Sequence, residues 1–503
     1  MHFRVGVSMT PHLPGGTLYP YQFDALEYAD QHQGRVLIAD EMGLGKTPNA
    51  LGWLWNKGLF RALVICPATI KLQWAREAMK WLGFEEDEIT VVNGIRPAPI
   101  TGSLAICNYD ILSRRLPDLL AFNPRAIVLD ESHYLKEAKA KRSKSAKFLC
   151  QQRGVESVVA LTGTPVLNRP KELWHQVQCI NPGIWPNWWR FAMRFCDAKR
   201  VETRWNTDNK ARDKAWDFNG ASNLDELDRT LRSEVMVRRQ KVDVMEHLPE
   251  LQTVTVPFEV NLSSYKKVRK EVQRRLAEVR DQLRRERESI NNLSDDARDI
   301  AIAGRAEGNS TVKLYGYLIQ EITKLKKEAA IAKLKVATDW IKDFTISTEE
   351  PLVVFTHHHD LSDALWEGLS ASHGEIPRPL DGRMPMAQRQ KYIDEFSNGK
   401  YPLLICGLKA MGMGVDGLQH RASHLAFMEF GWSPSDHAQA ASRLHRQGQE
   451  NAVTAHYLLA ADTLDERIAQ LLDAKSTVTS AVVGEMDTAG IMESIVDAIA
   501  EEA

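Results

Sequence analysis

The chain has 503 residues, which suggests about three to four domain-sized units, and its 44% hydrophobic and 26% charged residues are ordinary for a soluble globular protein. The net charge of −2 excludes a chain that is basic throughout, so any site for nucleic acid must be local. Six scattered cysteines without a C-x-x-C pair argue against a zinc site or a disulfide framework, and no apolar run approaches the roughly 18 residues of a membrane span. We therefore expect a soluble intracellular protein without a membrane partner, in the cytoplasm or nucleoid if bacterial or viral and in the nucleus if eukaryotic.

The first predicted element is a turn followed by an amphipathic helix pattern at residues 18–26. It contains Gln22, whose amide can donate and accept hydrogen bonds together and therefore suits the edge of an adenine base. The alternative is a simple N-terminal cap on the core, and these residues do not separate the two interpretations.

A glycine-rich turn follows the apolar run 36–39, which predicts a buried parallel strand. Such a turn lets backbone N–H groups close around phosphate oxygens, and the helix N-terminus after it adds positive potential. Lys46 would reach the β- and γ-phosphates of a nucleoside triphosphate, and Thr47 would hold Mg²⁺. Asp40 stands where the first glycine of G-x-x-x-x-G-K-[ST] is expected, so a chance glycine loop remains the alternative for these residues alone.

Two more apolar runs, 62–66 and 103–107, are each followed by a loop and predict further strands of the same sheet. Their loops place polar groups at the carboxyl ends of strands, where ligands bind in open α/β sheets. These loops contain Pro67, Ala68, Asn108 and Tyr109.

A fourth run, 126–129, leads straight into Asp130 and Glu131. Two adjacent carboxylates at the end of a buried strand are costly unless they face a metal or water. With Lys46 upstream, Asp130 would hold Mg²⁺ through its water shell, and Glu131 would orient and deprotonate the attacking water. The alternative is a solvated strand end. A fifth run, 157–161, leads to a hydroxyl and glycine turn at 162–165, which could sense a γ-phosphate.

These motifs, in this order, resemble the helicase-like ATPases of the Swi/Snf family: Gln22, residues 40–47 (DEMGLGKT), 130–133 (DESH) and 161–165 (LTGTP). In that family Asp commonly occupies the position of Asp40. The form D-E-S-H, with the residues after T-G-T-P, looks most like the annealing-helicase (HARP-like) branch. The resemblance implies ATP and Mg²⁺ as cofactors, and nucleotide contacts from Gln22, Asp40, Gly43, Gly45, Lys46 and Thr47.

The segment 181–225 loses regular periodicity and is rich in tryptophan and positive charge. We interpret it as a helical insertion in which the tryptophans pack, with contact to a phosphate backbone as the alternative. Residues 265–290 then predict a long helix with ten Lys or Arg against five Glu or Asp, a local charge of +5. A returning helix is expected from 312 to about 344. In the family this is the helical protrusion, and the alternative is a charged solvent face.

A second lobe begins with the apolar run 352–355, which ends at His357, His358 and His359. Neighbouring histidines on a strand or turn point in different directions, so we do not expect zinc there. A further strand is expected at 403–406. The alternation of strands and helices repeats the first half, and we expect an α/β protein with two RecA-like parallel-sheet lobes and helical insertions.

Two stretches of the second lobe complete the resemblance. The loop 409–418 resembles the family's G-x-G-L-N-L turn, with Asp416 and Gly417 replacing the usual residues, and we assign Gly414 in it to the nucleotide site. Arg443 and Arg446, at positions i and i+3, are expected on one helical face, from which they could act as arginine fingers.

The resemblance implies a DNA-dependent ATPase that translocates on duplex DNA, as a hydrolase of the helicase class. DNA contacts carried over from the family fall on Pro67, Ala68, Asn108, Tyr109, Thr162, His357 and His358. The expected organisation is lobe 1 at 1–235, an inter-lobe segment with the protrusion at 236–345, lobe 2 at 346–475 and a tail at 476–503. We expect a monomer without sequence preference on DNA. A strand-separating or annealing helicase and an inactive DNA-binding scaffold are the alternatives.

Overall fold

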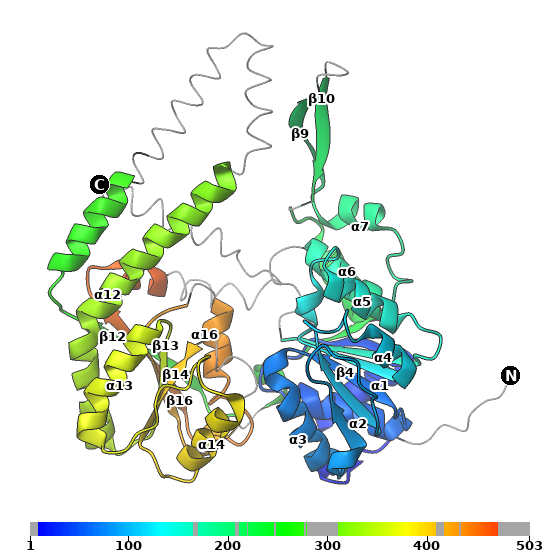
Figure 1. Ribbon diagram of the computed structural model, residues 1–503, viewed down its shortest axis with the longest axis horizontal. Coiled ribbons are helices and arrows are strands. Elements are labelled where there is room, and N and C mark those ends of the chain that lie inside the picture. The colour runs from blue at the N-terminus through cyan, green and yellow to red at the C-terminus, as the bar shows by residue number, and fades with distance from the viewer. Residues whose placement is uncertain are drawn as a thin grey trace. The chain divides into compact units, whose positions relative to one another are not determined.

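The computed structural model describes residues 9–163, 170–206, 211–218, 220–245, 248–275, 278, 310–408, 417–431 and 434–470. The chain divides into two compact units (Figure 1). The N-terminal unit comprises the chain up to Ala198 and the segment Phe218–Leu248, and the C-terminal unit is built mainly from the chain after Leu248. Gly414, the segment 281–309 and the tail 476–503 lie outside the described residues.

The N-terminal unit contains a seven-stranded sheet in the order β11-β3-β8-β7-β4-β6-β5, in which every neighbouring pair is parallel. Its strands are β3 (Arg35–Ile38), β4 (Ala62–Cys66), β5 (Ile89–Val91), β6 (Leu104–Asn108), β7 (Ala126–Asp130), β8 (Ser157–Leu161) and β11 (Met236–Val237). Successive strand residues such as Val36 and Leu37, which point to opposite faces, are both fully buried. Both faces of the sheet are therefore covered, as the continuous apolar runs predict.

Helices of this unit connect the strands (Figure 1). They are α1 (Pro20–Gln31), α2 (Lys46–Lys57), α3 (Lys71–Leu82), α4 (Leu116–Phe122), α5 (Lys141–Cys150), α6 (Pro170–Ile180), α7 (Trp188–Phe195), α8 (Leu224–Glu234) and α9 (Lys241–Val244). Parallel neighbours need such crossovers, and each crossover returns the chain to the same edge of the sheet. That edge, at the carboxyl ends of the strands, carries the residues discussed below.

The expectation of a helical insertion at 181–225 holds for α7 but is wrong for the residues that follow it. After α7 the chain forms an antiparallel hairpin of β9 (Lys199–Asn206) and β10 (Ala211–Asp217). Valine, threonine and tryptophan alternate along β9 with a period of two, a strand signal that the sequence interpretation missed. The packing interpretation is confirmed for Trp185 and Trp188, whose rings lie 4.9 and 6.0 Å from that of Phe191.

The C-terminal unit contains a five-stranded parallel sheet in the order β12-β16-β15-β13-β14. Its strands are β12 (Leu251–Phe258), β13 (Leu352–Thr356), β14 (Leu403–Gly407), β15 (His424–Phe427) and β16 (Val453–Ala460), and its helices include α12 (Ser310–Thr348), α13 (His359–His373), α14 (Met386–Ser397) and α16 (Pro434–Ala441). Two parallel-sheet lobes confirm the predicted fold class, and α12 confirms the predicted returning helix. Among the described helices, none has the length and apolar character to cross a membrane.

Candidate nucleotide site

The loop between β3 and α2 has the backbone that its glycines predict. Gly43 and Gly45 have φ values of 92° and 72°, in the left-handed region that glycine enters without strain. A Cβ atom on Gly45 would lie 2.4 Å from Nε2 of Gln22, so a side chain there would also clash. Helix α2 begins at Lys46, directly after this loop, and its first N–H groups are available at the helix N-terminus.

Lys46 lies over the loop that precedes it. Its Nζ donates hydrogen bonds to the carbonyl oxygens of Asp40 at 2.9 Å and Glu41 at 3.3 Å. Burial lowers the pKa of the Lys46 amine, and the nearby carboxylates of Glu131, Asp40 and Asp130 oppose that shift. A Cβ atom on Gly163 would be 3.7 Å from the same Nζ. The structure therefore brings the lysine, the two carboxylates at the end of β7 and the turn after β8 together, as the sequence predicts.

Asp130 is held by two hydrogen bonds at the end of β7. Its Oδ2 accepts one from Nε1 of Trp74 at 2.7 Å, and its Oδ1 accepts one from the backbone N–H of Glu131 at 2.9 Å. Burial, and then the charge of Glu131, raise the pKa of Asp130 to about 7. Trp74, on α3, orients this carboxylate. The sequence places Trp74 on a helix but gives no local signal for this role, because the contact joins residues 56 positions apart.

Glu131 adopts a left-handed backbone conformation, with φ 49° and ψ 54°. For a residue that is neither Gly, Asn nor Asp, this conformation costs on the order of 1–2 kcal/mol, and such strain concentrates at functional sites. Its side chain is partly buried, and Oε2 lies 3.3 Å from Nδ1 of His133. This backbone conformation changes the direction of the chain at Glu131, directly after Asp130. Glu131 thereby lies at the edge of the sheet, where a catalytic base is expected.

Asp40 is fully buried and is bound by Arg239, which follows β11 in the same unit. The Asp40 carboxylate accepts hydrogen bonds from the Arg239 backbone N–H at 3.0 Å, from Nε at 2.9 Å and from Nη2. Next to it, Oε2 of Glu41 accepts one from the backbone N–H of Lys241 at 2.8 Å. The Asp40 side chain therefore connects the loop to the segment after β11. Its expected contact with a nucleotide stays a prediction.

Gln22 also braces the loop. Its Nε2 donates to the carbonyl oxygens of Leu44 at 3.2 Å and Gly45 at 3.3 Å, and its Oε1 accepts from the backbone N–H of Tyr19 at 3.0 Å. With an exposed fraction of 1%, the amide uses its hydrogen-bonding groups on the protein. Its expected contact with an adenine edge stays a prediction.

The residues around the loop fit a nucleoside triphosphate with Mg²⁺. Thr47 and Asp130 offer oxygen ligands, which hard divalent cations prefer, and Lys46 offers a cation for phosphate oxygens. The pKa of Asp130 is raised because burial and the charge of Glu131 both disfavour its ionised form. A divalent cation bound there would favour the ionised form and offset both effects. The residues present therefore fit a metal and a nucleotide together.

The predicted DNA contacts in the N-terminal unit differ in exposure. Ala68 is exposed, but Pro67, Asn108 and Thr162 are buried. Tyr109 is 1% exposed within the core, and its hydroxyl donates to the carbonyl oxygen of Asp130 at 2.8 Å. The Tyr109 side chain therefore supports the backbone at Asp130 and has almost no surface with which to contact DNA.

In the C-terminal unit, the buried carboxylate of Glu429 holds the histidines after β13. Its Oε2 accepts hydrogen bonds from the backbone N–H groups of His357 at 2.8 Å and His358 at 2.9 Å, and its Oε1 pairs with Nδ1 of His358. Burial alone would raise the pKa of Glu429, but these hydrogen bonds keep it below its usual value. Both histidines remain partly exposed, so contact with a polyanion is sterically open to them.

The expected helical face for the two arginines is wrong. Helix α16 ends at Ala441, and Arg443 and Arg446 lie in the turns that follow. The backbone N–H of Arg443 bonds to the carbonyl of Ala440 and that of Arg446 to Leu444, so neither arginine makes the i→i−4 hydrogen bond of an α-helix. Both side chains are partly buried. Their role as arginine fingers stays a prediction.

Two family models and several curated proteins match this chain. The family model for the SNF2-related domain matches residues 21–303, and the model for the helicase conserved C-terminal domain matches residues 332–448. The Mus musculus protein "DNA annealing helicase and endonuclease ZRANB3" is 30% identical over 475 residues, which cover 93% of this chain and 41% of that protein.

Another relative is the Drosophila melanogaster SWI/SNF-related matrix-associated actin-dependent regulator of chromatin subfamily A-like protein 1. It is 32% identical over 470 residues, which cover 92% of this chain and 56% of that protein. The chain thus spans about half the length of these curated relatives. Among solved structures, the Sulfolobus solfataricus SWI2/SNF2 ATPase core in complex with dsDNA is 21% identical with a TM-score of 0.42, covering 98% of this chain and 97% of that one.

Proposed function

Because the chain belongs to the SNF2-related family, we propose that it hydrolyses ATP with Mg²⁺ and uses the energy to translocate along duplex DNA. The observation that carries this proposal is the meeting of Lys46 with Asp130 and the strained Glu131 at one edge of the N-terminal sheet. A phosphate-binding lysine next to an acidic pair is the arrangement that hydrolysis of a phosphoanhydride requires.

The roles of the residues follow from their chemistry. Lys46 and the N–H groups at the start of α2 bind the phosphates, and Thr47 and Asp130 hold the metal, which polarises the γ-phosphate when bound. Glu131 orients the attacking water and accepts its proton. We assign Arg443 and Arg446 to charge stabilisation in the transition state, and Gly414 to nucleotide binding.

The proposed partner is the phosphate backbone of duplex DNA. Contacts to phosphates carry no base information, so binding is expected to show little sequence specificity and a steep dependence on salt. Ala68, His357 and His358 have the exposed surface that such contacts need. We propose that the protein acts as a monomer inside the cell.

Strand annealing is the second candidate function. The observation that favours it is the similarity to the mouse protein whose name includes "DNA annealing helicase". Annealing would appear as ATP-dependent pairing of complementary strands in a plasmid bubble. A translocase that does not anneal would instead hydrolyse ATP on plain duplex and leave the bubble unchanged.

Hydrolysis assays with no DNA, single-stranded DNA and duplex DNA test the proposal. We expect duplex to stimulate the wild-type protein and Lys46→Ala to abolish the stimulated rate. Lys57→Ala is the matched control, because Lys57 ends the helix that Lys46 begins and pairs with the exposed Asp30. A hydrolysis rate that duplex DNA does not change would refute translocation. Full activity in the Lys46→Ala variant would refute the proposed nucleotide site.

A further inference from the structure

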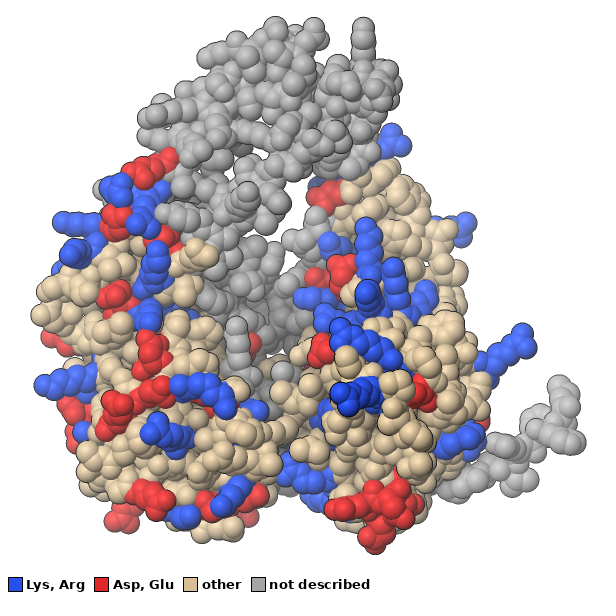
Figure 2. Space-filling model, in the orientation of Figure 1, with Lys and Arg blue, Asp and Glu red and all other residues tan. Residues whose placement is uncertain are grey.

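A strongly basic segment surrounds the start of α5 in the N-terminal unit. Residues 136–147 contain six Lys or Arg and a single acidic residue, Glu137, although the whole chain has a net charge of −2. Figure 2 shows basic side chains crowded on this part of the unit. Four of the lysines are exposed, namely Lys136, Lys139, Lys141 and Lys144.

These charges oppose the dipole of their own helix. Helix α5 begins at Lys141, and its N-cap, Ala140, provides no side-chain hydrogen bond to the first turn. No acidic residue lies in that turn, which instead contains Lys141, Arg142 and Lys144. Cations near a helix N-terminus are unfavourable, because that end already carries partial positive charge. Folding stability therefore does not explain why cations occupy this helix start. Binding of an external anion would explain them.

A hollow lies beside this helix start. It has a volume of about 530 Å³ and is lined by Tyr109, Asp110, Ser113, Arg114, Ala140, Lys141 and Arg142. Arg114 reaches it from the turn after β6, so cations from two separate elements converge there. Within the part of the chain that the structure describes, the side chains of Arg114, Lys141 and Lys144 form no ion pair. Nε of Arg142 donates to the carbonyl oxygen of Tyr134 at 3.0 Å, which fixes its position.

We propose that this hollow and the exposed start of α5 bind backbone phosphates of duplex DNA, an inference that rests on the proposed function. The basic segment continues along α5, whose 10 residues extend roughly 15 Å, so it covers more than one phosphate. One strand carries a charge about every 3.4 Å, which suits such an extended row better than a single small anion does. The start of α5 also follows β7, at the carboxyl edge that bears the nucleotide site.

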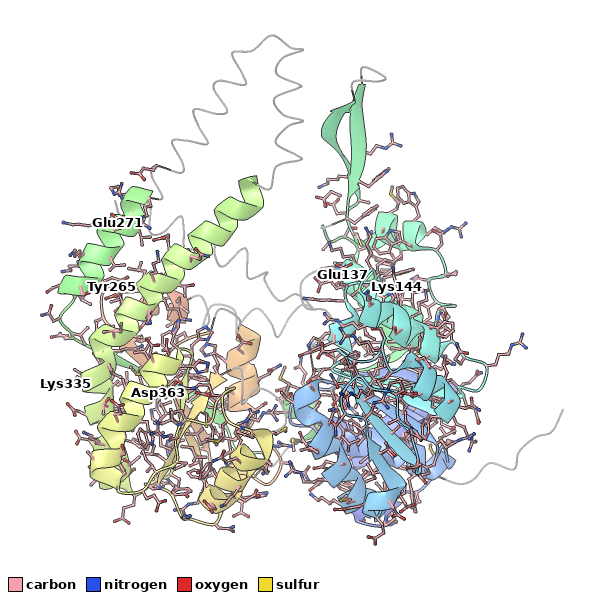
Figure 3. The ribbon with its side chains drawn as sticks, viewed as in Figure 1. Glu137, Lys144, Tyr265, Glu271, Lys335 and Asp363 are labelled. Atoms are coloured by element: carbon pink, nitrogen blue, oxygen red, sulfur yellow. The ribbon has the colours of Figure 1, made fainter. Side chains whose placement is uncertain are left out.

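The test compares two charge-removing double variants in DNA-binding titrations over a range of salt concentrations. Lys141→Gln with Lys144→Gln removes two cations from the start of α5, where Figure 3 labels Lys144. The matched control, Arg61→Gln with Arg153→Gln, removes two exposed cations next to the amino ends of β4 and β8, at the opposite edge of the same sheet. A third variant, Arg114→Gln, tests the other wall of the hollow.

We expect the Lys141/Lys144 variant to bind duplex about tenfold more weakly near 0.1 M salt, with the log–log salt slope smaller by about 2. Its thermal midpoint should equal or exceed that of the wild type, because charges unfavourable to the helix dipole are gone. Arg114→Gln should reduce the slope by about 1, and the control should change neither quantity. Equal losses in variant and control, or unchanged affinity in the variant, would overturn the proposal. If wild-type protein fails to bind duplex or to respond to it, the proposed function itself fails.

Discussion

At the scale of single residues, Glu131 and Asp130 each have a feature that lowers the stability of the folded chain at the proposed catalytic site. Glu131 has a left-handed backbone and Asp130 is a buried carboxyl whose pKa is raised to about 7. Neither feature stabilises the folded chain. Both belong to carboxylates that lie next to Lys46. A substitution that relieves either cost should therefore stabilise the fold and damage the site.

Replacing Glu131 by Asn should separate stability from activity. Asparagine tolerates the left-handed region, so the free energy of unfolding should rise by about 1 kcal/mol. Loss of the general base should reduce ATP hydrolysis by about 10²–10⁴-fold. Chemical denaturation and a phosphate-release assay measure the two effects, and Glu86→Asn, a change at an exposed carboxylate in the turn before β5, should alter neither. Full hydrolysis in the Glu131→Asn variant would show that another group is the base.

Asp130 should make stability depend on pH in a defined direction. Its folded pKa is about 7, against about 3.9 for an unfolded Asp, so between these values the folded chain binds a proton that the unfolded chain has released. Its contribution is present in acid and is lost as pH rises through 7. Asp130→Asn should therefore gain roughly 1–4 kcal/mol relative to wild type between pH 5 and pH 8, without nucleotide.

The difference between the two pH values is the quantity to measure, by urea denaturation of both proteins. Asparagine accepts fewer hydrogen bonds than the carboxylate, which Trp74 and the Glu131 N–H contact. The resulting loss of stability in the variant is the same at both pH values, so it cancels in the difference. An identical pH response in the two proteins would show that Asp130 is ionised at an ordinary pKa.

At the scale of elements, a buried ion pair attaches α12 to the segment after β16 of the C-terminal unit. Nζ of Lys333 lies 2.6 Å from Oδ2 of Asp465 and donates to the carbonyl oxygen of Leu458 on β16. The two side chains are 0% and 3% exposed. Because burial removes water from both charges, neither can lose its partner without a large penalty.

Lys333→Met should lower the free energy of unfolding by about 3–5 kcal/mol, because Asp465 is left buried without its cation. Adding Asp465→Leu should recover most of that loss, since the uncompensated charge is then removed. Lys342→Met is the control on the same helix: its partner, Asp339, lies 3.9 Å away and is 58% exposed, so the change should cost less than about 1 kcal/mol. A double variant as unstable as the single one would mean that packing, not charge, holds α12.

At the scale of the whole molecule, the proposed hydrolysis of ATP needs groups from both units. Lys46, Asp130 and Glu131 belong to the N-terminal unit, whereas Arg443 and Arg446 belong to the C-terminal unit. If an arginine completes the catalytic site, its loss should affect turnover and leave the phosphate-binding loop intact.

Arg446→Ala should reduce duplex-stimulated hydrolysis by about 10³-fold or more while ATP and DNA still bind. Fluorescent-nucleotide binding, DNA titration and steady-state hydrolysis together measure this. Arg467→Ala, at an exposed position of the same unit, is the control and should retain activity. If nucleotide affinity and turnover fall in parallel, Arg446 acts in binding and not as a finger.

The sequence by itself determined the features that depend on near neighbours. Buried parallel strands appear as apolar runs, a phosphate loop needs glycines at Gly43 and Gly45, and the acidic pair stands at the end of β7. The fold class and the positions of Lys46, Asp130 and Glu131 could therefore be predicted. The hairpin β9–β10 was missed because its alternation is short and polar, and the end of α16 was missed because the arginine spacing also fits a helix.

Only the tertiary structure decided which groups these residues meet. Asp40 and Gln22 have side chains suited to a ligand, yet Arg239, 199 positions away, binds the first, and the loop's own carbonyls bind the second. Tyr109 follows a strand end like a surface residue but is buried under Asp130, and Arg114 meets the start of α5 across a hollow. The reason is physical: hydrophobic periodicity and glycine conformation are local properties, whereas burial, hydrogen-bond partners and converging charge exist only after distant segments pack together.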